Sequence, residues 1–317
     1  MRTMLIIVAL IAVFVSEPLR AQENQCAVEL VVLGAGQDAG APQIGNHDDP
    51  GWQDNTQRLL ATSLALIDHR AGDHYLFEAT PDVREQLYNL DQHSPFQLNG
   101  PQDLSGVFLT HAHIGHYAGL MFFGHESAGA QDVVVHTMPR MADYLRNNGP
   151  WSQLVSLNNI ALNNLRANRT IILTQDIKIT ALPVPHRDEY SETVGFLIET
   201  ERHSALFLPD IDHWDLWRDK MGQDIRTIID DVDFAFLDAT FFDDHELPGR
   251  DMSKIPHPRV IKTMEALDTL ATQKKKGVYF IHYNHTNPIR DPNSQASHHV
   301  LDKNFNIARR GMNLCLQ

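Results

Sequence analysis

Cysteine is scarce in this 317-residue chain, which contains two, Cys26 and Cys315. Two cysteines at opposite ends of a sequence do not provide enough thiolates for a sulfur-rich zinc site. They leave two alternatives open. One is a disulfide that joins the ends of the chain, which requires an oxidising compartment. The other is a pair of unrelated free thiols.

Basic charge is also low, with 26 Lys and Arg against 40 Asp and Glu and a net charge of −14. Nucleic-acid backbones and anionic membrane surfaces are themselves negative, so the acidic excess argues against both as the main partner. We therefore expect no nucleic-acid partner. The charge does not identify the substrate, which we expect to be a small molecule. Composition predicts nothing about the oligomeric state.

Long hydrophobic runs are absent except for one at the start of the chain. Twelve apolar residues, Met4 to Val15, follow the basic Arg2. A membrane-spanning helix needs about 20 such residues, whereas this length suits a secretory signal peptide. We predict a signal peptide over 1–21, cleavage after Ala21, and a periplasmic or secreted protein with no stable membrane association. The alternative is an uncleaved membrane anchor.

The rest of the chain lacks linkers, low-complexity tracts and repeats, and its apolar content of 43% and charged content of 21% are typical of folded soluble proteins. Short runs rich in Val, Leu and Phe, bounded by turn residues, predict strands at 27–34, 62–68, 74–79, 105–110, 132–138, 169–174, 177–184, 194–200, 204–210, 233–239 and 277–283. Amphipathic segments predict helices at 80–90, 138–149 and 258–273. Because the two kinds of element interleave, we predict one mixed α/β domain over 22–317.

A glycine-rich segment, "VVLGAGQDAGAP" at 31–42, follows the first predicted strand. Gly34, Gly36 and Ala39 fit a dinucleotide-binding fingerprint loosely. That fingerprint must open a helix, which Gly40 and Pro42 oppose. We interpret the segment as a turn, or as a loop close to a different ligand.

The segment "FLTHAHIGHYAGL", residues 108–120, places His111, His113 and His116 in a predicted strand-to-helix loop. Neutral imidazole nitrogens bind metals, and residues two apart at a strand end point to the same side. A single histidine is usually an ordinary surface or core residue. Three of them within six positions favour a metal site.

More candidate ligands follow other predicted strands, at the ends where sites in layered α/β folds gather. They are His186, Asp210, Asp238, His282 and His285. Nitrogen and carboxylate ligands without thiolate fit zinc, manganese or iron. Asp210 has an alternative role as the N-cap of the helix that follows it, and Asp212 is then the substitute candidate.

The motif "THAHIGH" resembles the H-x-H-x-D-H signature of the metallo-β-lactamase fold superfamily. Within that superfamily the chain is similar to the pyrroloquinoline quinone biosynthesis protein B family and its phosphodiesterase relatives. The matching stretches are "LGAGQDAGAPQIG", "EATPDVREQL", "FLDATFFDDHEL", "FIHYNHTNPI" and "NFNIARRGMNLCL". The resemblance implies a four-layer αβ/βα sandwich with a metal site at one edge of two facing sheets.

The resemblance also implies the ligands of one or two divalent ions, zinc first, with manganese or iron as alternatives. The first ion would take His111, His113 and His186; the second would take His116, Asp210 and His282, with Asp210 bridging.

Two departures from the family pattern bear on these ligands. Gly115 stands where the motif carries an acid, which predicts a second metal position that is altered, weakened or lost. His285 stands where the family tends to have asparagine, and we interpret it as a compensating ligand or an outer hydrogen-bond donor. We take Asp210 and His285 as the catalytic candidates.

A further departure lies at 42–52, "PQIGNHDDPGW", which lacks the cysteines that many relatives use for a structural zinc. Another ion could bind Asn46, His47, Asp48 and Asp49, but we expect a solvated loop. Several aromatic residues could line a pocket or belong to the core: Trp52, Tyr117, Phe122, Phe123 and Trp151.

Three functions remain open at this point. The favoured one is a metal-dependent hydrolase of an ester, phosphodiester or lactone, in which Asp210 orients the attacking water. The second is an iron-dependent oxygenase, as the family resemblance implies, although that substrate is cytoplasmic and a signal peptide opposes the role. The third is a metal-binding protein without catalysis.

Overall fold

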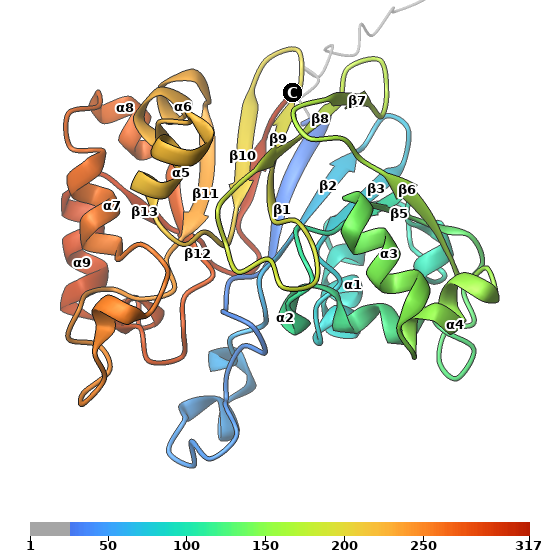
Figure 1. The fold of residues 1–317 in the computed structure, drawn as a ribbon, viewed down its shortest axis with the longest axis horizontal. Coiled ribbons are helices and arrows are strands. Elements are labelled where there is room, and N and C mark those ends of the chain that lie inside the picture. The colour runs from blue at the N-terminus through green and yellow to red at the C-terminus, as the bar shows by residue number, and fades with distance from the viewer. Residues whose placement is uncertain (1–25) are drawn as a thin grey trace, which may run out of the picture.

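The computed structural model describes residues 26–317, so the predicted signal peptide and its cleavage point lie outside the described residues. Two seven-stranded sheets face each other in the middle of the molecule, with helices outside both of them (Figure 1). In the described part of the chain, no helix is long and apolar enough to span a bilayer.

The first sheet has the order β14-β1-β2-β3-β4-β5-β6. Its strands are β1 (Val28–Gly34), β2 (Ser63–Asp68), β3 (Asp73–Phe77), β4 (Gly106–Phe108), β5 (Val133–Thr137), β6 (Ile160–Asn164) and β14 (Asn313–Cys315). The pairs from β3 to β6 are parallel, and those among β14, β1, β2 and β3 are antiparallel. The elements that cover or connect this sheet are η1 (Pro50–Trp52), η2 (Asn55–Gln57), α1 (Val83–Asp91), η3 (Pro101–Asp103), α2 (Ile114–Tyr117), η4 (Ala118–Phe123), α3 (Pro139–Asn147) and α4 (Trp151–Ser156).

The second sheet has the order β13-β12-β11-β10-β9-β8-β7. Its strands are β7 (Thr170–Ile172), β8 (Lys178–Pro183), β9 (Val194–Glu199), β10 (Ser204–Leu208), β11 (Phe234–Asp238), β12 (Val278–Ile281) and β13 (Asn306–Ile307). The pairs from β10 to β13 are parallel. The elements that accompany this sheet are α5 (Trp214–Met221), α6 (Ile225–Asp231), η5 (Met252–Lys254), α7 (Val260–Ala266), α8 (Thr272–Lys276), η6 (Pro288–Arg290) and α9 (Gln295–Asp302).

Strand periodicity explains the layers, because successive side chains of a strand point to opposite faces. In β1, Leu30 and Val32 enter the core between the two sheets, whereas Val31 and Leu33 enter a second core beneath the first sheet's helices. Both faces of the sheet are therefore covered. The predicted four-layer αβ/βα sandwich is confirmed.

The predicted strands all match strands of the structure, but three strands were not predicted: β6, β13 and β14. β13 and β14 have only two and three residues, and β6 ends in two asparagines, so none shows a clear apolar run. The helix predicted at 258–273 is wrong as one element. It ends at Ala266, and a separate α8 begins at Thr272.

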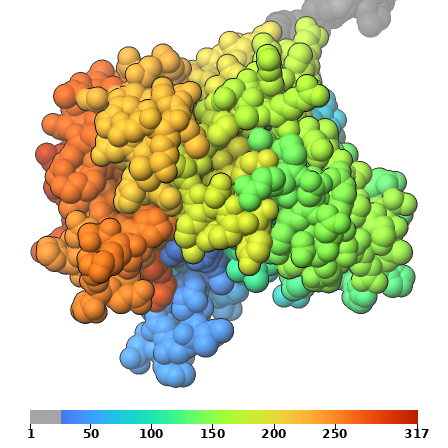
Figure 2. All heavy atoms as spheres, in the orientation of Figure 1, coloured from blue at the N-terminus to red at the C-terminus, as the bar shows by residue number. Residues whose placement is uncertain are grey.

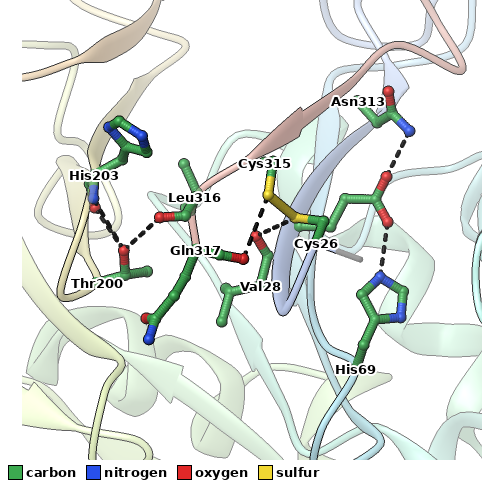
Figure 3. Close-up of a disulfide and its surroundings, with 10 residues drawn as sticks. Cys26, Val28, His69, Thr200, His203, Asn313, Cys315, Leu316 and Gln317 are labelled. Carbon is green, nitrogen blue, oxygen red and sulfur yellow. Dashed lines mark hydrogen bonds and ion pairs between the residues drawn. A yellow bond between two sulfur atoms is a disulfide. The ribbon is translucent and has the colours of Figure 1, made fainter. Parts of the chain in front are cut away.

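The two cysteines form a disulfide, which decides between the two alternatives for Cys26 and Cys315 (Figure 3). The last strand, β14, pairs antiparallel with β1 and places Cys315 opposite Glu29. The carbonyl of Gln317 then accepts hydrogen bonds from the amides of Ala27 and Val28. The C-terminal strand is thus held against the start of the described chain by backbone pairing and by a covalent bond.

Candidate metal centre

The predicted ligands come from loops at the carboxyl ends of strands, at one edge of the two sheets. His111 and His113 follow β4, and His116 lies in α2. The remaining three, His186, Asp210 and His282, follow β8, β10 and β12. Parallel neighbours such as β10, β11 and β12 end at the same edge, so loops far apart in sequence meet there.

Three histidines converge on one point. The Nε2 atom of His111 lies 2.8 Å from Nδ1 of His113, which lies 3.1 Å from Nε2 of His186. Nitrogens bound to a tetrahedral zinc at 2.0–2.1 Å would be about 3.3 Å apart. Ligand atoms of these three residues and of Asp210 all lie within 4.8 Å of one another. The spacing fits a divalent metal.

One oxygen of the buried Asp210 stands at the centre of the site. Its Oδ2 lies 3.4 Å from His111 Nε2 and 3.3 Å from His186 Nε2. The same oxygen lies 3.7 Å from His116 Nε2 and 3.9 Å from His282 Nε2. It therefore faces both predicted ligand groups. The alternative role as a helix N-cap is wrong, because α5 begins at Trp214 with His213 in the cap position.

Outer partners fix the histidine rings on the β3–β4 side. His111 Nδ1 lies 2.9 Å from the hydroxyl of Thr110, which donates to Glu78 at 2.5 Å. His116 Nδ1 lies 3.2 Å from the same Glu78 oxygen. With Nδ1 occupied from outside, both rings present Nε2 to the centre. Such contacts set ring orientation and tautomer in metal sites.

The other sheet orients its histidines in the same way. His186 Nδ1 lies 3.0 Å from Asp212, and His282 Nδ1 lies 3.0 Å from the hydroxyl of Thr240. Thr240 in turn donates to Asp238 at 2.8 Å. Asp212 is therefore an outer partner of His186. Because Asp210 occupies the cluster, Asp212 is not needed as its substitute.

Burial and neighbouring charges set the protonation of these groups. Burial lowers the pKa of His111 well below its usual value and that of His282 to about 4. Burial also acts to lower the pKa of His186, but Asp210 and Asp212 outweigh it and raise that pKa to about 9. Burial alone would raise the pKa of Asp210. His186, His257 and His282 outweigh it and hold that pKa well below its usual value.

His257 is a buried member of the site that the sequence did not indicate. Its Nδ1 lies 2.9 Å from Asp238 Oδ2 and 3.1 Å from Asp210 Oδ1. Although burial lowers its pKa, the carboxylates of Asp238 and Asp210 raise it to about 10, so the ring carries a proton at neutral pH. His257 follows η5 rather than a strand, so the strand-end pattern does not find it.

Glu78 was also missed, because one buried acid after a strand gives no signal by itself. Glu78, His257 and His282 have φ of 74°, 80° and 62°, in the left-handed region. Among residues 26–317, every other non-glycine residue with positive φ is Asp or Asn, which tolerate it. Backbone strain of this kind concentrates at functional sites.

Other candidate residues lie away from the cluster. His285 lines a cavity of about 700 Å³ together with Tyr283 and Arg290. His47 and Asp48 are exposed, as expected of a solvated loop. That expectation is wrong for Asp49, whose buried carboxylate pairs with both terminal nitrogens of Arg290, at 2.5 and 2.7 Å. The chain between β1 and β2, which contains these residues, extends below the two sheets in Figure 1 and protrudes at the lower edge of the molecule in Figure 2.

The aromatic candidates divide between surface and core. Phe123 is fully buried, and Trp52 is 56% exposed. Tyr117 packs on Trp151, with ring centroids 4.8 Å apart, and through Tyr144 this group reaches the exposed Tyr190. Tyr190 belongs to the β8–β9 loop, which lies at the centre of the face shown in Figure 2.

A histidine-rich cluster around one buried aspartate, at the edge of two facing sheets, is the arrangement of the metallo-β-lactamase fold. The family model described as "Beta-lactamase superfamily domain" matches residues 73–283. The chain belongs to this superfamily.

Within the superfamily the chain is PqqB-like. It is 24% identical to coenzyme PQQ synthesis protein B of Xanthomonas campestris pv. campestris (strain B100), over 91% of this chain and 100% of that protein. The zinc-bound PqqB of Methylobacterium extorquens superposes with a TM-score of 0.71 at 19% identity, covering 90% and 99% of the two chains. A diphosphatase of the PhnP family superposes with a TM-score of 0.62 at 21% identity, covering 90% and 96%.

Proposed function

We propose that this protein is a metal-dependent hydrolase of a small-molecule ester, phosphodiester or lactone. One observation carries the proposal: inward nitrogens of His111, His116, His186 and His282 surround a single oxygen of Asp210 within 3.9 Å. His113 completes the group through His111 and His186. A buried carboxylate placed among imidazoles in this way is suited to bridge two divalent ions.

The proposed ligands keep the predicted division. His111, His113 and His186 would hold the first ion, and His116 and His282 would hold the second, with Asp210 available to both. The all-nitrogen-and-oxygen donor set fits zinc, which a solved PqqB also contains. A divalent ion bound here would polarise the scissile group and lower the pKa of a bound water to about 7.

The chain's own residues would position the reactants and transfer protons. Asp210 accepts a hydrogen bond from the attacking water and orients it. The Nδ1 atom of His257 hydrogen-bonds to Asp238 at 2.9 Å and lies 3.1 Å from Asp210 Oδ1, so Nε2 would be the atom that donates a proton to the leaving group of the substrate. We propose His257 as the donor of that proton, and we retain His285 as a residue that contacts the substrate from outside the cluster.

The relatives suggest which substrates to test first. A similar solved structure is a diphosphatase. Phosphodiesters and diphosphates should therefore be tested as substrates before lactones and carboxylic esters. We also propose that the protein is exported through the segment 1–21. The disulfide between Cys26 and Cys315 supports export, because such bonds persist in oxidising compartments.

The first test is elemental analysis of the mature protein, purified without chelator or affinity metal. It is run in parallel on His111→Ala/His186→Ala and on a control, His125→Ala, in which the changed histidine is exposed. We expect one to two equivalents of zinc or manganese in the wild type and control. The double variant should lose the first ion and phosphodiesterase activity together. His285→Ala should lower activity at unchanged metal content.

Two outcomes would overturn the proposal. If the double variant keeps its metal and every activity, the assigned residues are not the ligands. If the wild type holds about one equivalent of iron and consumes oxygen without hydrolysing any substrate, the protein is an oxygenase.

A further inference from the structure

The turn that follows β1 lies directly against Gly115, the residue that stands where the family motif carries an acid. A Cβ added to Gly115 would stand 2.5 Å from Cα of Asp38 and 2.7 Å from its carbonyl oxygen. Real Cβ atoms do not approach backbone this closely, so no side chain fits at 115 while the turn keeps its place. The glycine is thus explained by the backbone that occupies its side-chain space.

The same turn places a carboxylate near the second metal position. A carboxylate oxygen of Asp38 lies within 4.8 Å of ring nitrogens of His116 and His282, which are themselves within 4.8 Å of each other. Asp38 is solvent-exposed on its other side. Within residues 26–317 its carboxylate takes part in no hydrogen bond or ion pair.

A surface aspartate in a turn is commonly just solvated. The Nε2 atoms of His116 and His282 indicate a bound group beside this one. Both are buried and have no hydrogen-bond partner among the described residues, although their Nδ1 atoms are held by Glu78 and Thr240. Buried imidazole nitrogens without partners are rare unless another group binds them.

Backbone hydrogen bonds hold the turn that carries the Asp38 carboxylate. The Gln37 amide donates to the carbonyl of Tyr283 at 3.0 Å, and Gly40 donates back to Gln37 at 2.8 Å. The Ala41 amide donates to the carbonyl of Leu59 at 2.7 Å. Asp38 itself has φ of 47°, a conformation that Asp and Asn adopt more readily than other non-glycine residues.

We infer that Asp38 is the carboxylate ligand of the second metal, supplied from the β1 turn in place of the acid that Gly115 cannot carry. With His116, His282 and the bridging Asp210 it completes a set of two nitrogens and two carboxylates. This inference rests on the proposed metal site. It reverses the expectation that Gly115 marks a weakened second position, and it assigns the compensating role to Asp38 instead of His285.

The test compares Asp38→Asn and Asp38→Gly with the wild type and with a matched control, Asp48→Asn, which removes an exposed acid from the same loop. Both Asp38 variants suit positive φ, so the fold should persist, as circular dichroism would check. Each mature protein, with its disulfide intact, is loaded with zinc. Metal content and stepwise affinities are measured by elemental analysis and competition with a chromophoric chelator. Cobalt absorption reports coordination at each position.

We expect two equivalents in the wild type and in the control. Both Asp38 variants should bind the first ion normally and the second at least about tenfold more weakly, with the second cobalt spectrum altered. A wild type with two ions and Asp38 variants with the same two affinities would overturn this inference alone. A wild type with a single ion whose affinity does not depend on Asp38 would also overturn it. A wild type that binds no ion would overturn the metal site itself.

Discussion

Removing the disulfide between Cys26 and Cys315 should destabilise the fold measurably. The bond joins residues separated by 289 positions, so it closes nearly the whole described chain into one loop. In the chain-entropy treatment, closing a loop of that length stabilises the folded state by about 6 kcal/mol at 25 °C. Measured values for disulfides reach about 5 kcal/mol, so we expect a loss of about 2–5 kcal/mol for Cys26→Ser/Cys315→Ser.

The native contacts around the bond do not depend on it. In the double serine variant the backbone pairing of β14 with β1 and the hydrogen bonds to Gln317 remain available. The loss should therefore come from a freer unfolded chain and leave the native structure intact. The metal content and the activity should be close to those of the wild type at low temperature.

Urea unfolding measures the effect on three samples: oxidised wild type, wild type with reductant, and the double serine variant. The last two should coincide, with midpoints about 1–2 M below the first. In a fourth sample, reductant added to the double variant should not shift its midpoint, which controls for effects of reductant on other parts of the molecule. Equal midpoints for all three samples would refute the reasoning and show that strand pairing alone secures the chain ends.

Three further predictions follow from single positions. Gly115→Ala should push the turn at Asp38 away, lower the unfolding free energy by about 1–3 kcal/mol and weaken the binding of the second metal ion. Wild-type stability and metal content in this variant would contradict the prediction. Burial raises the pKa of Glu246 from 4.5 to about 7, so the folded protein binds an extra proton between these values and stability falls as pH rises through them. At pH 8, Glu246→Gln should raise the free energy of unfolding by about 1–3 kcal/mol and raise the melting temperature with it, whereas at pH 4 it should change both little. An equal effect at pH 8 and pH 4 would contradict the raised pKa of Glu246. Asp49→Asn should destabilise by about 2–4 kcal/mol, because it leaves Arg290 without its buried partner, whereas Asp48→Asn should be neutral in the same thermal scan.

The predicted ligand residues show what a local pattern can provide. His111, His113 and His116 stand in one short loop, and Asp210 and His282 follow strands with strongly apolar runs. Parallel strands bring their carboxyl ends to a common edge, so residues placed after such strands were expected to meet. That four histidine Nε2 atoms lie 3.3–3.9 Å from one oxygen of Asp210 is visible only in the structure.

The residues that were missed share a different property, because their role depends on contacts with segments that are distant in sequence. Glu78 is important for the hydroxyl and imidazole it holds, and His257 for its position between two carboxylates. His257 lies in none of the stretches that carry the resemblance, and Glu78 opens one of them without any role being indicated for it. Each has a left-handed backbone conformation, which is uncommon for a non-glycine residue. Local propensity therefore predicts against them, and tertiary contacts compensate for the strain.

By itself the sequence determined a mixed α/β domain and the histidine loop, because strand periodicity and strand ends are local properties of the chain. The sandwich and the bridging role of Asp210 were implied by the family resemblance. Only the tertiary structure decided that Cys26 and Cys315 are bonded and that Asp212 orients His186. It also showed why position 115 carries glycine and no acid: the backbone of Asp38 occupies the volume that a side chain there would need. Such decisions depend on segments that approach each other from distant parts of the chain, and no window of sequence contains both partners.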